Sequence, residues 1–314
     1  MSRRAGDTLA SNRMAEEFAN VGDLEICYET FGHPKDPPLL LVMGLGTQMV
    51  GWPEGFCHAL VERGLYVIRY DNRDIGRSTH LRRLRPPSLK QLLLRDKTAA
   101  PYSLADMAAD GIGLLDHLGI DRAHVAGASM GGMIAQTMAV EHPERILSLA
   151  SVMSNTGHLW KGVPGLRVYP IFMRPPVTGR ENAIEATVST FKLIGSPGFP
   201  FDEEELRRTA ARSFERGHNP AGAGRQLAAI LAAGDRTAQL RRITAPTVVV
   251  HGTRDRMIMP SGGRETAKAI PGARLVMIEG MGHDLPRGAW EQIVDAVAAN
   301  AERASTASRN SAAA

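Results

Sequence analysis

A serine flanked by glycines, placed between a strand pattern and a helix pattern, constrains this fold more than any other feature of the sequence. The segment GASMGG at residues 127–132 follows a short apolar run at 124–126 and precedes a helical pattern at 130–140. A residue in so sharp a turn adopts strained backbone angles, and glycines two residues before and after Ser129 let the strand and helix approach each other. The pattern predicts that the Ser129 hydroxyl is exposed at the end of a strand. By itself, the segment also fits an ordinary glycine-rich turn that happens to contain a serine.

Apolar runs alternate with helical patterns on both sides of this turn. Strands are predicted at residues 25–31, 39–43, 65–70, 124–126, 146–153, 247–251 and 274–278. Helices are predicted from near residue 53, and at 103–118, 130–140, 263–270 and 286–300. Strand, helix, strand implies a parallel pair, and uninterrupted apolar runs are typical of strands buried on both faces. The fold class predicted is α/β, with a mostly parallel central sheet flanked by helices.

The alternation of strand and helix patterns stops between residues 154 and 239. There, Pro/Gly-rich loops surround helical patterns at 201–216 and 224–233. We interpret 154–239 as a helical cap inserted into a core formed by 21–153 and 240–303. Residues 1–20 are expected to be a flexible N-terminal segment. Residues 304–314 are small and polar without periodicity, so they are expected to be a disordered tail.

Composition excludes several classes of protein. Apolar residues make up 43% of the 314, charged residues make up 22%, and 37 basic residues against 33 acidic ones give a formal charge of +4. The cluster Arg82, Arg83 and Arg85 has no aromatic partners and is interpreted as a solvated face, so neither a nucleic-acid partner nor stable membrane insertion is predicted. The two cysteines, Cys27 and Cys57, form no metal-binding spacing. With no signal-peptide pattern or apolar span, a cytoplasmic location is expected.

Two further side chains complete a catalytic pattern with Ser129. A serine hydroxyl needs a base, the base needs an acid to orient it, and chains of this kind carry acid and then histidine after the serine. Asp255 follows the apolar run 247–251, and His283 follows 274–278 in the segment GMGH. Carboxyl ends of parallel strands are where sites form in open α/β sheets. Alone, Asp255 fits a turn residue and His283 a loop histidine; together with Ser129 they predict a Ser-His-Asp triad.

Other candidates for these roles are weaker. His251 ends a strand beside a glycine and is interpreted as structural, and His142 precedes a proline at a helix end. Asp284 adjoins His283 but is not preferred as the acid. Some relatives of this architecture place the acid one strand earlier, but residues 154–157 (SNTG) offer no carboxylate.

Backbone amides are expected to stabilise an oxyanion beside Ser129. The helix that begins at the serine directs its free N–H groups toward this point, which predicts the amide of Met130 as one donor. The second is assigned to Leu45, in the loop after the strand at 39–43, although a shift of one residue would make it Gly44. Glycine there allows the backbone to approach a substrate, but an ordinary strand-ending turn would also use it.

These motifs together resemble the α/β-hydrolase superfamily over nearly all of residues 24–300 except the insertion. Within it the chain looks like aclacinomycin methylesterase and related bacterial carboxylesterases. The matching segments are 41–44, 51–53, 68–78, 121–125 and 280–283. The resemblance implies hydrolysis of methyl, other small-alcohol or short- to medium-chain esters through an acyl-enzyme, without metal or organic cofactor. The chain departs from the common pattern at Met43, where a histidine is usual.

The resemblance also implies that the cap covers Ser129 and selects the substrate. Gly44, Trp160 and Met173 are the residues expected to bind it, and Ile171, Phe172 and Phe191 are further candidates for an apolar lining, although such spacing also fits simple core packing. Perhydrolase or haloperoxidase-like chemistry and carbon–carbon bond hydrolysis use the same triad. A small-ligand receptor on the same fold is the non-catalytic alternative. The partner expected is a small-molecule ester, and a homo-oligomer is left open.

Overall fold

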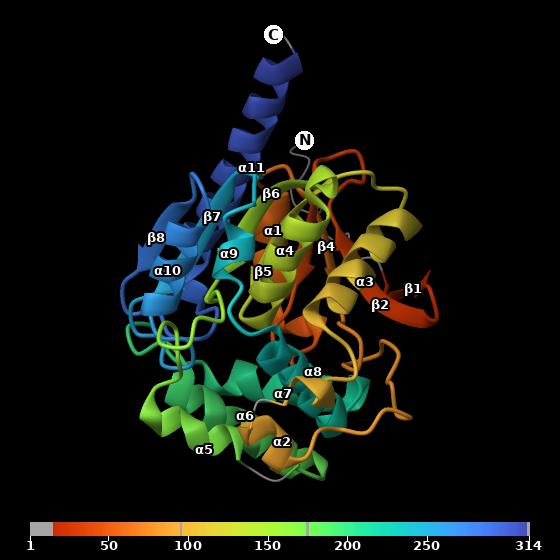
Figure 1. Ribbon diagram of the computed structural model, residues 1–314, viewed down its shortest axis with the longest axis vertical. Coiled ribbons are helices and arrows are strands. Elements are labelled where there is room, and N and C mark those ends of the chain that lie inside the picture. The colour runs from red at the N-terminus through yellow and green to blue at the C-terminus, as the bar shows by residue number, and fades with distance from the viewer. Residues whose placement is uncertain (1–14, 95, 174–175, 313–314) are drawn as a thin grey trace, which may run out of the picture.

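The molecule is built around one eight-stranded sheet with the strand order β1-β2-β4-β3-β5-β6-β7-β8 (Figure 1). The structure is a computed structural model that describes residues 15–94, 96–173 and 176–312. The strands are β1 Glu17–Val21, β2 Leu24–Phe31, β3 Pro38–Val42, β4 Tyr66–Tyr70, β5 Ala123–Ala128, β6 Ile146–Val152, β7 Thr247–Gly252 and β8 Arg274–Ile278. Strand β2 runs antiparallel to its neighbours β1 and β4, and the remaining pairs are parallel. The predicted fold class is confirmed.

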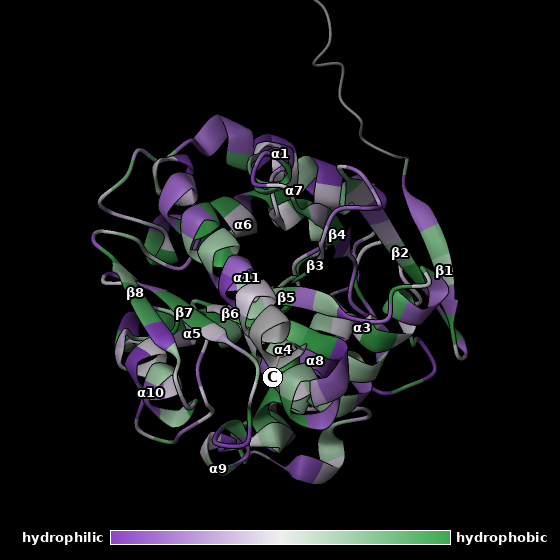
Figure 2. Ribbon diagram, turned by 90° about the horizontal axis from the view of Figure 1, so that it is seen from above, coloured by the Kyte–Doolittle hydropathy of each residue, from purple (hydrophilic) through white to green (hydrophobic). Residues whose placement is uncertain are grey.

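Helices cover both faces of the sheet. The flanking helices are α1 Glu54–Val61, α3 Leu104–His117, α4 Met130–Glu141, α10 Ser261–Ala269 and α11 Trp290–Ala312. Side chains alternate along each strand, so Leu40 and Val42 of β3 pack with α3 and α4, whereas Leu39 and Leu41 pack with α1 and α11. Helix α4 is buried from residue 130 to residue 139, and with the central strands it is largely hydrophobic in Figure 2. The serine turn is therefore anchored in the centre of the core.

The cap lies beyond the carboxyl ends of the parallel strands, at the lower end of the view in Figure 1. Between β6 and β7 it contains α5 Tyr169–Phe172, α6 Arg180–Ile194, α7 Glu203–Arg216 and α8 Pro220–Ala233. The next helix, α9 Thr237–Leu240, lies beside the core helices α4 and α10 instead. Helix α2, Leu89–Leu93, and the short helical turn Lys97–Ala99 contact α8. The segment between β4 and α3 therefore joins the cap layer, which the sequence analysis did not separate from the core.

Buried polar contacts attach the cap to the segment that follows β4. The Arg225 guanidinium of α8 donates to both carboxylate oxygens of Asp74, at 2.8 and 2.6 Å. At the end of α7, Arg216 donates to Asp71 at 2.9 Å. Because the two arginine side chains and both carboxylates are buried, pulling the cap away would leave charges without partners, which is costly. These ion pairs therefore fix the position of the cap on the core.

Both chain ends differ from the sequence-based expectation. Residues 17–20 of the expected flexible segment belong to β1, and residues 1–14 lie outside the described residues. The expected tail is helical, because α11 continues to Ala312. Alanine is the strongest helix former, Ala304 is buried at 3% exposure, and the Ser305 hydroxyl donates to the Ala301 carbonyl one turn earlier.

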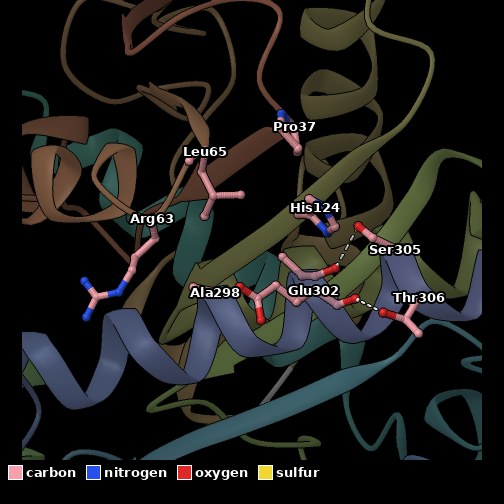
Figure 3. A pocket seen from close by; sticks show the side chains of 10 residues that line it. Pro37, Arg63, Leu65, His124, Ala298, Glu302, Ser305 and Thr306 are labelled. Atoms are coloured by element: carbon pink, nitrogen blue, oxygen red, sulfur yellow. Dashed lines mark hydrogen bonds between the residues drawn. The ribbon is translucent and has the colours of Figure 1, made fainter.

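A cavity of about 270 Å³ opens between α11 and the amino ends of β3, β4 and β5 (Figure 3). His124 lies in its wall, with Nδ1 2.8 Å from the Ser148 hydroxyl. Five residues of extended strand separate His124 from Ser129, about 16 Å. This cavity is thus at the opposite end of the sheet from the serine turn. Burial lowers the pKa of His124 to about 4.

We expect the stability of the protein to fall in mild acid because of this histidine. An unfolded imidazole binds a proton near pH 6.5, whereas buried His124 stays neutral down to about pH 4, so the unfolded state holds more protons between these values. The free energy of unfolding should drop by about 3 kcal/mol across this window. Urea denaturation between pH 4 and 7 measures it. His124→Gln should flatten the slope without abolishing it, since burial also lowers the pKa of His251; equal slopes would contradict the assignment.

Candidate active site

Ser129 occupies a strained turn between β5 and α4. Its backbone has φ 56° and ψ −121°, a left-handed conformation that non-glycine residues rarely adopt. A Cβ at Gly127 would lie 2.1 Å from the Gly131 carbonyl oxygen, and one at Gly131 would lie 2.1 Å from the Val42 carbonyl oxygen. The Ser129 amide donates to the Val152 carbonyl of β6 at 2.9 Å. The two glycines are required because the backbones of β3, β5 and α4 converge around the serine.

The loops after β7 and β8 bring an acid and a histidine to the same point. His283 Nε2 lies 3.0 Å from Ser129 Oγ, and His283 Nδ1 lies 2.7 Å from Asp255 Oδ2. The other oxygen of Asp255 accepts the amides of Met257 and Ile258 at 2.9 and 2.8 Å. Asp255 is 1% exposed and His283 is 8% exposed. The structure thus brings the three predicted triad residues into one hydrogen-bonded chain.

This chain defines which atoms can move a proton. With Asp255 accepting two amide hydrogens on one oxygen, its second oxygen accepts the N–H of His283 Nδ1. That tautomer leaves the lone pair of Nε2 directed at the Ser129 hydroxyl. A base within hydrogen-bond reach of a hydroxyl, itself oriented by a buried carboxylate, is the arrangement that activates a serine nucleophile.

The loop after β3 lies against Ser129. A Cβ at Gly44 would be 3.1 Å from Ser129 Cβ and 3.6 Å from Ser129 Oγ, so only a glycine leaves the space between them open. The Leu45 amide follows in this loop. The Met130 amide lies in the first turn of α4, where backbone N–H groups have no carbonyl acceptor within the helix. Gly44 and Met130 therefore adjoin the serine from two different segments, and the oxyanion roles of Leu45 and Met130 stay a prediction.

Comparison with known proteins identifies the family. The model of the α/β hydrolase fold family matches residues 37–286. The chain belongs to the α/β-hydrolase family. Rhodomycin D methylesterase DnrP of Streptomyces peucetius is 32% identical over 301 residues, which cover 88% of this chain and 94% of that protein. The predicted resemblance to bacterial methylesterases of this family is thereby confirmed.

More distant α/β hydrolases share the architecture. The 3-oxoadipate enol-lactonase 2 of Acinetobacter baylyi is 25% identical, over 82% of this chain and 86% of that protein. The solved enol-lactonase of Burkholderia xenovorans aligns with a TM-score of 0.69 at 24% identity, over 90% of this chain and 99% of that chain. At this identity the structural likeness supports the fold alone.

Two residues of this α/β hydrolase that the sequence analysis missed hold the loop after β3. The Asn72 side chain donates to the Met43 carbonyl at 2.9 Å, at the position where the family usually has a histidine. Gln226, on cap helix α8, accepts the Gly46 amide at 2.9 Å and donates to the Arg73 carbonyl at 3.0 Å. The segment DNRDIGRS at 71–78 was recognised as a family motif, but its contacts with this loop follow only from the tertiary structure.

The remaining candidates do not take over the acid or base role. His251 is buried, its Nε2 donates to the Ile258 carbonyl at 2.8 Å, and it lies 3.5 Å from Asp255 Oδ2. Burial lowers the pKa of His251, so it is neutral near pH 7. Asp284 is hydrogen-bonded to the hydroxyl of Ser196 in the cap. The preference for Asp255 over Asp284 therefore agrees with the geometry.

Gly44 lies against Ser129, but the two cap residues predicted to bind substrate are exposed. Trp160 is 80% exposed and Met173 is 57% exposed. In this structure neither lies in a buried pocket beside Ser129, and a role for either in substrate binding stays a prediction. Within the described ranges, no group of three or more histidine, cysteine or acidic side chains is arranged to hold a metal ion, and no helix is long and apolar enough to cross a membrane.

We expect Gly131→Ala to destabilise the protein because its Cβ would meet the Val42 carbonyl oxygen at 2.1 Å, a backbone atom that cannot rotate away. The free energy of unfolding should fall by about 3 kcal/mol or more. Gly224→Ala is the matched control, since its Cβ on α8 has no neighbour nearer than 3.9 Å and alanine favours helices by about 0.5–1 kcal/mol. Urea denaturation of both variants measures the difference, and equal stabilities would contradict the steric argument.

Proposed function

We propose that this protein is a serine carboxylesterase that hydrolyses esters of small alcohols through an acyl-enzyme. The observation that carries the proposal is the hydrogen-bonded chain Ser129, His283, Asp255, with links of 3.0 and 2.7 Å. Its similarity to a rhodomycin D methylesterase at 32% identity supports a carboxylic ester as substrate and methanol as one leaving alcohol. Short- and medium-chain esters are included in the proposal.

In the first half of the proposed cycle, Ser129 Oγ attacks the ester carbonyl carbon while His283 Nε2 accepts the hydroxyl proton. Asp255 stabilises the resulting imidazolium through its hydrogen bond to Nδ1. The amides of Leu45 and Met130 donate to the carbonyl oxygen as it becomes an oxyanion. His283 then gives its proton to the departing alcohol, and the acyl group remains on Ser129.

In the second half, water attacks the acyl-enzyme. His283 takes one proton from the water, the same two amides hold the second oxyanion, and the proton then passes to Ser129 Oγ as the carboxylic acid leaves. The cycle uses one water, releases one alcohol and one acid, and calls on no metal or organic cofactor. A cytoplasmic location, like the absence of a cofactor, stays a prediction from the sequence.

We expect wild-type protein to release nitrophenol from nitrophenyl esters and methanol from a methyl ester. Ser129→Ala should lower kcat by at least about a thousandfold, since the nucleophile is lost. Ser189→Ala is the matched control, because Ser189 lies on the exposed side of α6 and its hydroxyl donates within the helix to Ala186. The chain-length series, from acetyl to long acyl, measures the size of the acyl pocket.

Two other outcomes would contradict the nucleophile assignment or the esterase function. Full activity in Ser129→Ala would show that Ser129 is not the nucleophile. Wild-type protein inert on every ester would reject the esterase proposal, and assays with a diketone substrate and with hydrogen peroxide would then separate carbon–carbon hydrolysis and perhydrolysis from a receptor that leaves its ligand intact.

A further inference from the structure

The turn between cap helices α6 and α7 contacts the loop that carries His283. The His283 amide donates to the Ile194 carbonyl at the end of α6, at 2.8 Å. The Gly282 amide donates to the Ser196 hydroxyl oxygen at 2.7 Å. Nearer the start of the loop, the Gly198 amide donates to the Gly280 carbonyl at 3.0 Å. Three points of the histidine loop are therefore held by the cap. The loop after β7 holds the same segment from the sheet side, where the Gly280 amide donates to the Thr253 hydroxyl at 3.0 Å.

Ser196 connects the two sides of His283. Its hydroxyl oxygen accepts the Gly282 amide, and its hydroxyl hydrogen is donated to Asp284 Oδ1. One side chain thus binds both the residue before the histidine and the residue after it. Ser196 is 8% exposed, and burial raises the pKa of Asp284. Water is poorly placed to substitute for either hydrogen bond, so removing the hydroxyl leaves polar groups unsatisfied.

The backbones of the cap turn and the histidine loop pack closely against each other. A Cβ at Gly282 would lie 2.3 Å from the Gly195 carbonyl oxygen, and a Cβ at Gly198 would lie 2.5 Å from Gly280 Cα. The two segments meet backbone to backbone, without flexible side chains between them. A displacement of the cap turn must therefore move the histidine loop or break its hydrogen bonds.

We propose that Ser196 is a positioning residue. Through it, the position of the base His283 depends on the contact between the cap and the histidine loop. Asp255 fixes the His283 ring from the sheet side, and Ser196 fixes the backbone around His283 from the cap side. With both in place, Nε2 stands at 3.0 Å from Ser129 Oγ. Displacing the α6–α7 turn would weaken the base, so the chemistry depends on the contact between this turn and the histidine loop. This inference rests on the proposed esterase function.

The test is Ser196→Ala, with Ser196→Thr as the rescue and Ser189→Ala as the control on α6. We expect Ser196→Ala to lower kcat by about tenfold to a hundredfold, the scale of a small misplacement of a catalytic group, while KM changes less than about twofold. Labelling of Ser129 by a fluorophosphonate needs the same base and should slow by the same factor. Ser196→Thr keeps the hydroxyl and should recover most of the rate. The thermal midpoint shows that each variant is folded.

Gly198→Ala probes the same contact without touching a polar group. Its Cβ would press on Gly280, so it should also lower kcat and the labelling rate; if Ser196→Ala does not fold, this variant alone decides the question. Rates in Ser196→Ala and Gly198→Ala equal to the Ser189→Ala control would overturn the inference. A rise in KM with unchanged kcat and labelling would also overturn it, because Ser196 would then act on substrate binding. Wild-type protein inert on all esters would instead reject the esterase function itself.

Discussion

The structure depends on the close approach of three backbone segments around Ser129. A serine held at φ 56° costs about 1–3 kcal/mol of backbone strain, and such strain persists only where the surroundings leave the chain no alternative. Here β5 is paired on both sides, α4 is buried from residue 130 to 139, and glycines at 127 and 131 remove the side chains that would separate them. The hydroxyl is consequently presented at the edge of the sheet, where the loops after β3, β7 and β8 can reach it.

The same edge receives the cap, and several buried polar contacts join the cap to the core. Arg225 with Asp74 and Gln226 with the Gly46 amide attach α8 to the core on one side of Ser129. Ser196 attaches the α6–α7 turn to the histidine loop on the other side. Hydrogen bonds and ion pairs are directional, so they specify the position of the cap more sharply than an apolar contact of similar area would. A cap held in this way can both select a substrate and set the geometry of the groups beneath it.

The catalytic groups and the cap come from different parts of the chain. Ser129, Asp255 and His283 come from loops of the sheet and from the start of α4, within the residues 37–286 that match the α/β hydrolase fold family. Trp160 and Met173 of the cap are exposed and lie outside the buried site. In the proposed esterase, α6, α7 and α8 would decide which acyl and alcohol groups reach Ser129.

The sequence by itself determined the fold class and predicted the three residues that the structure joins in one hydrogen-bonded chain. Ser129, Asp255 and His283 each follow an apolar run, and the periodicity of such runs is a local property that needs no knowledge of distant contacts. Residues 17–20 and 304–312 were predicted incorrectly from the same kind of evidence. Small polar residues at 304–312 carry no apolar stripe, yet alanine's helix propensity and the burial of Ala304 extend α11 through them.

Only the tertiary structure decided which side chains support the site. Gln226 meets Gly46 across 180 residues of sequence, and Ser196 meets Gly282 across 86. A polar residue in a cap helix has many partners open to it, and no local pattern shows which backbone amide it will face once the chain has folded. The apolar pattern places the catalytic loops at one edge of the sheet. The directional contacts that fix them there exist only after distant segments have packed together.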